Sequence, residues 1–295
     1  MLNFLKNGIE NCGVIFPKKD CNRLLKEIYK TRNFKNIFLS KKNFLNKKKL
    51  NIKLNPSPGN NLLHKIDCSF IFENKFFINK MKKVLGQNYR ILNHKLVMGV
   101  PENYLPSWVK KLTKNKNTNN LGVYIKPKYR DITYFKGIDF HQDIIDYPTR
   151  IADFITVYIY LDNVDLNTSP LFLIKDSHRL GATKFPHNLT INSENKKVLY
   201  KYKKNKLISK ISVLEGGAGS ISYWHPFILH GTQPHKDNLP RISVRILAEK
   251  NRWCPIKCDL DKVNTKINGN LSIKNPWKVS KNKNKLRNNK INKLK

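Results

Sequence analysis

The feature that most constrains the fold is a series of short alternating runs between residue 121 and about Glu249. In each run apolar and polar side chains alternate, as in strands that bury one face, and turn residues separate the runs. The runs are Ile155–Leu161, Pro170–Ile174, Ile208–Leu214, Ser220–Tyr223 and Ile242–Ala248. Many short strands at such spacing are typical of an antiparallel sandwich or barrel. We therefore expect a mainly β fold with flanking helices.

The part of the chain before these runs predicts two helices, a loop and a strand. Apolar residues recur at helical spacing over Pro17–Lys30. Asn74–Leu85 has a capping asparagine at its start, and Gly86 follows its end. Lys41–Asn61 is rich in Lys and Asn and predicts a loop, whereas the alternating Ile91–Val100 predicts a strand.

These patterns divide the chain into three regions. We expect residues 1–120 to form an N-terminal helical and strand region that packs on a barrel, and residues 121–250 to form the barrel itself. Residues 251–295 form a basic extension. Its last part, Lys266–Lys295, has ten Lys and Arg residues, no acidic residue and few apolar ones, which predicts a solvated and partly disordered tail.

The chain is strongly basic, with 57 Lys and Arg against 20 Asp and Glu, a formal net charge of +37. Such a charge is compatible with contact to nucleic acid or another polyanion. Lys and Asn are abundant throughout the chain, however, so a biased composition explains the charge equally well. Residues 131–180 differ, with eight acidic and four basic residues and thus a net charge of −4. Any chemistry in that segment takes place in a locally acidic stretch.

The cysteines indicate a reducing compartment. There are five, an odd and scattered set in a long chain, which argues against a disulfide framework. The N-terminus has no apolar segment of signal-peptide length, and no run of 18 apolar residues occurs. We expect a cytoplasmic protein without a membrane span. The spacing of Cys254 and Cys258 suits zinc, but no second pair lies nearby, so no zinc site is predicted.

The first candidate metal-binding pair is His141-x-Asp143. In an extended chain, residues i and i+2 project from the same face, so one divalent metal can contact both side chains. An imidazole and a carboxylate suit a first-row transition metal. Because such a pair is common by chance, a third ligand is needed to make the prediction specific.

His230 is the candidate third ligand, at the end of an apolar run that we expect to be a core strand. Two histidines and one carboxylate occupy one face of a metal and leave three positions open, as in non-haem Fe(II) oxygenases. His225 is the main rival, five residues earlier in the same run, but it precedes a proline rather than the Gly-Thr turn that follows His230. We favour His230.

A strand that begins at Arg241, eleven residues after His230, supplies a buried cation. Arg241, Ser243 and Arg245 share one face of it, and the apolar residues between them share the other. A guanidinium can bind a carboxylate through two hydrogen bonds, worth about 1.5–3 kcal/mol. A dicarboxylate could then chelate the metal at one end and meet Arg241 at the other. Arg245 is either a substrate contact or a structural ion-pair partner.

The motifs His141-x-Asp143, His230-Gly231-Thr232 and Arg241 resemble those of the Fe(II)/2-oxoglutarate dioxygenases of the phytanoyl-CoA dioxygenase-like family. Three further segments resemble this family. Ile155–Asp162 resembles the hydrophobic strand ending in Leu-Asp that follows the first motif, and Ser169–His178 resembles the segment that closes in Ser-His. Gly216–His230 resembles the glycine turn and strand that lead to the distal histidine. The turn before the distal histidine departs from the family, since its usual Gly-Asp pair is Gly-Ser here. The similarity covers most of residues 1–250.

The resemblance implies a double-stranded β-helix, also called a jelly roll or cupin-like fold, and it implies the roles of the site residues. The implied Fe(II) ligands are His141, Asp143 and His230. The implied 2-oxoglutarate contacts are Arg241, Thr232 and Ser243. The implied reaction uses O2 to hydroxylate a C–H bond of a small molecule, for example an acyl or anionic metabolite, with release of succinate and CO2. Related halogenases lack the metal-binding carboxylate, so Asp143 favours hydroxylation.

Two other functions are compatible with the sequence. One is a nucleic-acid demethylase of the same superfamily, which the positive charge favours although the basic residues are diffuse. The other is a catalytically inactive jelly-roll protein that binds nucleic acid or another polyanion. Retention of all four key residues, the three ligands and Arg241, argues against the inactive protein. The sequence does not identify the substrate.

Overall fold

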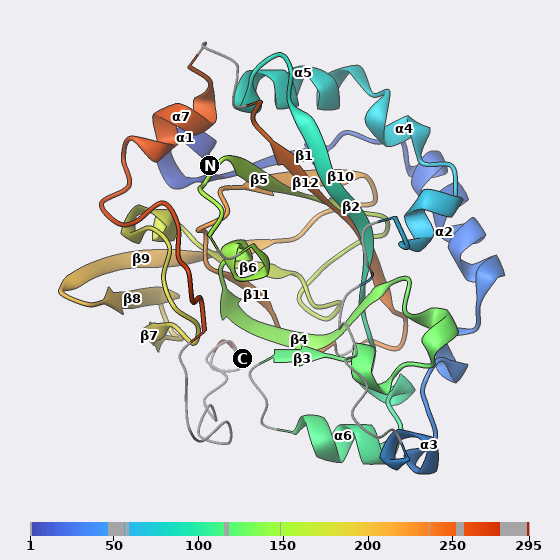
Figure 1. The fold of residues 1–295 in the computed structure, drawn as a ribbon. Helices are drawn as coiled ribbons and strands as arrows, with labels where there is room; N and C mark the ends of the chain where they lie inside the picture. Colours follow the sequence, from blue (N-terminus) through green and yellow to red (C-terminus); the bar gives the residue numbers. More distant parts are fainter. Residues whose placement is uncertain are drawn as a thin grey trace.

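A twelve-stranded sheet organises the computed structural model, which describes residues 2–46, 56, 59–114, 118–147, 149–235, 237–251, 257–277 and 294 (Figure 1). Its strands are β1 Ile9–Val14, β2 Arg90–Gly99, β3 Thr118–Asn120, β4 Thr133–His141, β5 Phe154–Tyr160, β6 Leu171–Ile174, β7 Asn188–Asn192, β8 Lys197–Tyr202, β9 Asn205–Leu214, β10 Ser220–Trp224, β11 His230–Thr232 and β12 Arg241–Glu249. They are ordered β1-β10-β5-β12-β2-β4-β11-β6-β9-β8-β7, with β3 paired to β4. Only the β2–β4 pair is parallel among these described strands.

Alternation along the central strands separates two apolar layers. On β12, the apolar residues from Ile242 to Ile246 pack outward, in a core shared with the N-terminal helices. The opposite face points into the barrel, where residues of β2, β5, β6, β9 and β10 pack together in a second core. Because strands from both halves of the sheet contribute to this second core, the sheet must fold over on itself. The interior of the barrel is therefore where polar residues of β12 can meet those of β4 and β11.

Helices cover the outer face of the β12 half of the sheet (Figure 1). The α-helices are α1 Phe4–Asn7, α2 Lys18–Thr31, α3 Lys41–Leu45, α4 Ser69–Phe72, α5 Lys75–Leu85, α6 Ser107–Thr113 and α7 Asp259–Asn264. The predicted helices at Pro17–Lys30 and Asn74–Leu85 are confirmed as α2 and α5, and Asn74 caps α5 by accepting from the Phe77 backbone N–H. The flanking-helix, mainly β architecture follows the sequence prediction. None of the helices in the described part of the chain has the length and hydropathy that a bilayer crossing requires.

The structure corrects three local predictions. The expected loop at Lys41–Asn61 begins with helix α3, which Ser40 caps, while residues 47–55, 57 and 58 lie outside the described residues. The apolar run before His230 is not one strand, because β10 ends at Trp224 and residues 225–229 turn the chain into β11. The six strands β1, β3, β4, β7, β8 and β11 were not expected, since each is either mixed in pattern or very short.

Residues 257–277, here called the C-terminal strap, pack against the barrel. Helix α7 buries Leu260 and Val263 in the outer core, next to α1 and α5. Residues 266–277 continue along the segment 179–185 through backbone hydrogen bonds, so this portion of the expected solvated tail was wrongly predicted. Sequence periodicity missed it because single apolar residues such as Ile267 and Ile273, rather than a periodic face, anchor it. Residues 278–293 and Cys254 lie outside the described residues.

Candidate metal centre and adjoining pocket

His141 and His230 face each other across two adjacent strands. His141 is the last residue of β4, and it lies directly opposite His230, the first residue of β11, in an antiparallel pair. Residues opposite each other in such a pair project from the same face, and the two ring centroids are 4.3 Å apart. The β4–β11 register thus brings together two side chains that are 89 positions apart in the sequence.

Asp143 joins the two histidines from the start of a short 3-10 helix, Asp143–Asp146. Gln142, between the two motif residues, points the other way and donates to the carbonyls of Gly181 and Phe227, at 2.9 Å each. This alternation places the Asp143 carboxylate beside the rings, with Oδ2 3.6 Å from His230 Nε2. One ligand atom from each of the three residues lies within 4.8 Å of the other two, and all three residues are buried.

The hydrogen bonds of the two histidines favour metal binding. His141 Nδ1 lies 3.0 Å from the Asp139 carbonyl, and His230 Nδ1 lies 3.0 Å from the Ile228 carbonyl. Because a carbonyl only accepts, each Nδ1 carries a proton and donates it to the carbonyl, which leaves the Nε2 of each ring as the atom available to a metal. Burial, together with the neighbouring His230, lowers the pKa of His141 to about 3, which keeps this ring neutral. The donor set, two imidazole nitrogens and one carboxylate, fits a divalent transition metal.

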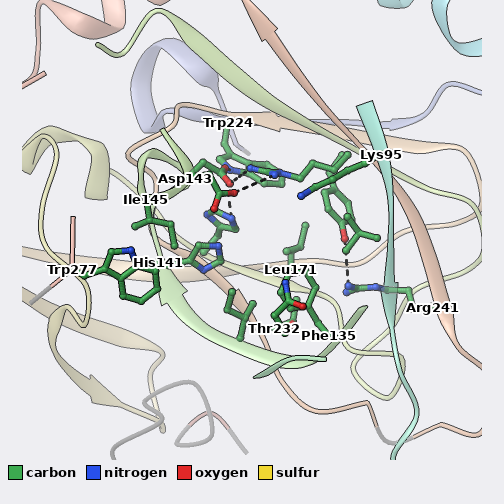
Figure 2. A pocket seen from close by; sticks show the side chains of 17 residues that line it. Lys95, Phe135, His141, Asp143, Ile145, Leu171, Trp224, Thr232, Arg241 and Trp277 are labelled. Atoms are coloured by element: carbon green, nitrogen blue, oxygen red, sulfur yellow. Dashed lines mark hydrogen bonds and ion pairs between the residues drawn. The ribbon is translucent and has the colours of Figure 1, made fainter. Parts of the chain in front are cut away.

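Three donors fix the Asp143 carboxylate. Trp224 Nε1 donates to Oδ2 at 3.1 Å (Figure 2). Thr156 Oγ1 donates to the same oxygen at 2.6 Å, and the Arg245 guanidinium donates to Oδ1. Burial alone would raise the pKa of Asp143, but opposing interactions, the charge of the Arg245 guanidinium first, lower that pKa below its usual range. The carboxylate is therefore ionised and held in one orientation, as a metal ligand must be.

Arg245 lies on β12 and faces the pocket. Besides Asp143, its Nη1 lies 3.6 Å from Asp146 Oδ2. Of the two roles considered for Arg245, the ion-pair role matches these contacts, and the residue also lines the pocket. Burial by itself would lower the pKa of Arg245, but the two carboxylates raise it, so the side chain stays charged.

A cavity of about 210 Å³ opens beside the three candidate ligands (Figure 2). Its lining residues are Lys95, Val97, Asn120, Phe135, Ile138, His141, Asp143, Ile145, Asp146, Tyr158, Leu171, Trp224, His230, Thr232, Arg241, Arg245 and Trp277. Eight of these 17 residues are apolar or aromatic, and the nine polar or charged ones converge from β2, β3, β4, β11, β12 and the 3-10 helix Asp143–Asp146. Such a pocket is the usual setting of a small-molecule site.

Arg241 lies across the cavity from the three candidate ligands (Figure 2). It is 4% exposed; Nη1 bonds the Ser169 carbonyl and Nη2 lies 3.4 Å from the Tyr158 hydroxyl. Its Nε has no partner, and no carboxylate of the described residues forms an ion pair with it. A buried guanidinium without a counter-charge can bind an incoming carboxylate.

The other two residues expected to hold the co-substrate differ in position. Thr232 lines the pocket at the end of β11. Ser243 is fully buried on β12, and its hydroxyl has no partner in the described part of the chain, but it is not among the lining residues. The structure therefore brings Thr232, but not Ser243, to the pocket wall beside Arg241.

Lys95 and Trp277 line the pocket although sequence reasoning did not select them. Lys95 on β2 lies directly opposite Arg245 on the adjacent strand β12. Burial and the Arg245 charge lower its pKa to about 8. In the sequence, the sign that Lys95 could be a pocket residue is that it is the single lysine within the predicted strand Ile91–Val100. For Trp277, the corresponding sign in the sequence is that a single tryptophan occurs in a polar, basic segment.

The other histidines lie away from the three candidate ligands. His225 Nε2 bonds Asn264 Oδ1 at 2.9 Å, and its Nδ1 accepts from the Phe227 backbone N–H at 3.2 Å, so both of its nitrogens are engaged. His94 stacks on His64 with a centroid distance of 4.2 Å. His178 is buried beside His225. None of these joins the described cluster of candidate ligands.

The fold and the pocket together define a barrel protein whose interior can hold a metal ion beside a buried arginine. The chain belongs to the phytanoyl-CoA dioxygenase (PhyH) family, whose model matches residues 17–243. This confirms the family suggested by the sequence motifs. No curated protein is significantly similar to the chain.

Several solved structures are similar to this chain, and EvdO2 shares its fold. EvdO2 from Micromonospora carbonacea var. aurantiaca, complexed with 2-oxoglutarate, is 9% identical with a TM-score of 0.51, over 84% of this chain and 88% of that one. AviO1 from Streptomyces viridochromogenes Tue57 is 11% identical with a TM-score of 0.47, over 86% and 95%. The α-ketoglutarate-dependent epimerase SnoN from nogalamycin biosynthesis is 9% identical with a TM-score of 0.48, over 84% and 79%. The predicted jelly-roll fold is confirmed.

Proposed function

We propose that this protein is an Fe(II)- and 2-oxoglutarate-dependent dioxygenase that hydroxylates a C–H bond of a small molecule. The observation that carries the proposal is the placement of two buried histidines, one buried carboxylate and one buried arginine without an ion-pair partner among the described residues around a single cavity. Membership of the PhyH family supports it. When bound, Fe(II) with 2-oxoglutarate and O2 would supply the oxidising power for breaking a C–H bond, with succinate and CO2 as co-products.

The protein residues have separate tasks in this proposal. His141, Asp143 and His230 would hold the metal on one face and leave the other face open toward the cavity. Arg245 keeps Asp143 charged and oriented through the contact described above. The apolar side chains of the wall would limit the entry of water once substrate is bound, which would strengthen the electrostatic contacts inside the site.

The co-substrate would span the cavity. Arg241 would bind the carboxylate that is remote from the metal, and the Thr232 hydroxyl on the same wall would add a hydrogen bond. Ser243 lies between Arg241 and Arg245 on β12 but does not line the cavity, and its contact with the 2-oxoglutarate carboxylate remains a prediction from the family resemblance.

Hydroxylation is the preferred outcome because Asp143 supplies the carboxylate that halogenases lack. EvdO2, which shares the fold, is described with 2-oxoglutarate bound, and this favours the same co-substrate here. The cysteine pattern still favours a cytoplasmic, reducing location. A small molecule is the proposed substrate, and contact with nucleic acid stays a minor alternative.

The test is an anaerobic titration of the purified protein with Fe(II), followed by an assay of succinate and CO2 release from 2-oxoglutarate. One Fe(II) per chain and O2-dependent succinate formation are expected. Absence of both Fe(II) binding and turnover would contradict the proposal. Binding of the metal without any turnover of 2-oxoglutarate, in the presence of a broad metabolite mixture, would favour the inactive binding protein instead.

A further inference from the structure

The C-terminal strap is fixed to the barrel along segment 179–185 and at Thr149. Four backbone hydrogen bonds anchor it: Asn268 N to Arg179 O at 2.8 Å, Ala182 N to Asn270 O at 2.8 Å, Thr149 N to Ile273 O at 3.1 Å, and Phe185 N to Pro276 O at 2.7 Å. Spread over nine residues of the strap, these bonds define its path up to Trp277.

Two glycines let the strap approach closely. A Cβ added to Gly269 would lie 2.1 Å from the Leu180 carbonyl oxygen, and one added to Gly181 would lie 2.6 Å from the Asn270 carbonyl oxygen. Real Cβ atoms do not approach that closely, so only glycine fits at both positions. The contact between strap and barrel is therefore specific packing and not the chance adhesion of a tail.

The strap ends by placing Trp277 in the wall of the pocket (Figure 2). Its ring lies 5.2 Å from that of Phe185 at an interplanar angle of 71°, an edge contact that holds the indole in place. Trp277 is nevertheless 44% exposed. Figure 2 shows it beside Ile145 and His141, with Arg241 across the cavity.

This position separates Trp277 from the place assigned to 2-oxoglutarate. If the co-substrate spans from the metal to Arg241, the space on the other side of the ligands is left for the molecule to be oxidised. The residues at that side include Trp277 and Ile145, which offer a flat aromatic ring and an aliphatic branch. Trp277 also lies beyond residue 243, where the family match ends, so the general family pattern does not dictate it.

We propose that Trp277 is a substrate-contacting residue that selects molecules presenting a flat, largely apolar ring to the metal. The inference rests on the proposed function, because it needs 2-oxoglutarate on the Arg241 side. A half-exposed indole held at its edge can stack on such a ring with a centroid separation of about 4.5–7 Å. A linear chain of equal size would make less contact with the same surface.

The experiment measures binding, so that it does not depend on turnover. Wild-type protein is titrated calorimetrically with 2-naphthol, indole and coumarin, and with the linear compounds 1-heptanol and octanamide. Each titration is run on the protein alone and with Ni(II) and 2-oxoglutarate added, Ni(II) replacing Fe(II) to prevent oxidation. The variants are Trp277→Ala and Trp277→Phe, and Leu271→Ala is the matched control. Leu271 is also exposed on the strap but does not line the pocket.

Ring compounds should bind wild-type protein better than linear ones. Trp277→Ala should weaken their binding about ten-fold or more, and Trp277→Phe should keep most of it because a flat ring remains. Leu271→Ala should match wild type. Equal binding of ring and linear compounds, no binding of any ring compound, or an unchanged Kd in Trp277→Ala would overturn the inference. Ring binding that depends on Trp277, in a protein that forms no succinate, would instead refute only the proposed function.

Discussion

Replacement of Arg241 by alanine is expected to raise the KM for 2-oxoglutarate about 10- to 100-fold without loss of Fe(II). The guanidinium is buried, is held by the Ser169 carbonyl and the Tyr158 hydroxyl, and has one N–H group without a partner. A carboxylate that binds there gains a charge-assisted hydrogen bond of about 1.5–3 kcal/mol, which corresponds to about 10- to 150-fold in affinity. Arg241 is outside the cluster of candidate ligands, so metal binding should persist.

The assay is succinate formation at varied 2-oxoglutarate, with KM and kcat determined separately and iron content measured for each variant. Arg241→Lys should lie between wild type and alanine, because an ammonium keeps the charge but lacks the planar fork. Arg90→Ala is the control. Arg90 is a mostly exposed arginine on the neighbouring strand β2, and it forms an ion pair with Glu249 of β12 at 2.5 Å. A KM within two-fold of wild type in Arg241→Ala, or an equal change in Arg90→Ala, would refute the assigned co-substrate site.

Four further predictions follow from the same geometry. His141→Ala, Asp143→Ala and His230→Ala should each abolish stoichiometric Fe(II) binding, measured by metal analysis, whereas His225→Ala should retain it; the reverse pattern for His225 and His230 would overturn the ligand assignment. Arg245→Ala should weaken metal affinity about 10- to 100-fold because it removes a donor that orients Asp143, and an unchanged metal Kd would contradict this role. Burial lowers the pKa of His225 from 6.5 to about 4, so between these pH values the unfolded state binds more protons than the folded state. The free energy of unfolding should therefore be level above about pH 6.5 and fall toward pH 4 by about 1.4 kcal/mol per pH unit for this group. Denaturant titrations at several pH values should show a shallower fall in His225→Gln. Gly269→Ala should lower the Tm by about 2–6 °C because the added Cβ would clash with Leu180. Gly217→Ala should lower the Tm less, because a Cβ added there meets only ordinary contacts. Equal Tm values for the two variants in scanning calorimetry would refute the close approach of the strap.

Local periodicity in the sequence was sufficient for several elements and for the inner face of β12. Alternation along Arg241–Glu249 predicted that Arg241 and Arg245 share a face, and both line the pocket. The helical spacing of α2 and α5 and the Asn74 cap of α5 could likewise be predicted from the sequence. These features depend on neighbours a few residues apart, which the 2.0 and 3.6 residue repeats of strands and helices encode directly.

The pairing of distant segments was decided only by the tertiary structure. The sequence placed His230 at the end of a strand, but its position opposite His141 depends on the β4–β11 register, and residues 225–229 turn His225 away toward Asn264. The role of Arg245 likewise required the distance to Asp143.

The C-terminal strap shows most clearly that local sequence patterns do not predict the packing of distant segments. Nothing periodic marks residues 266–277, and their basic, polar composition predicted a solvated tail. Two glycines and a few backbone hydrogen bonds nonetheless hold Trp277 in the pocket wall. The sequence by itself determined the motif residues, the alternating strands and the capped helices, because short-range patterns carry them. Which side chains meet in the pocket was decided by long-range register and close packing, since these depend on contacts between residues far apart in the chain.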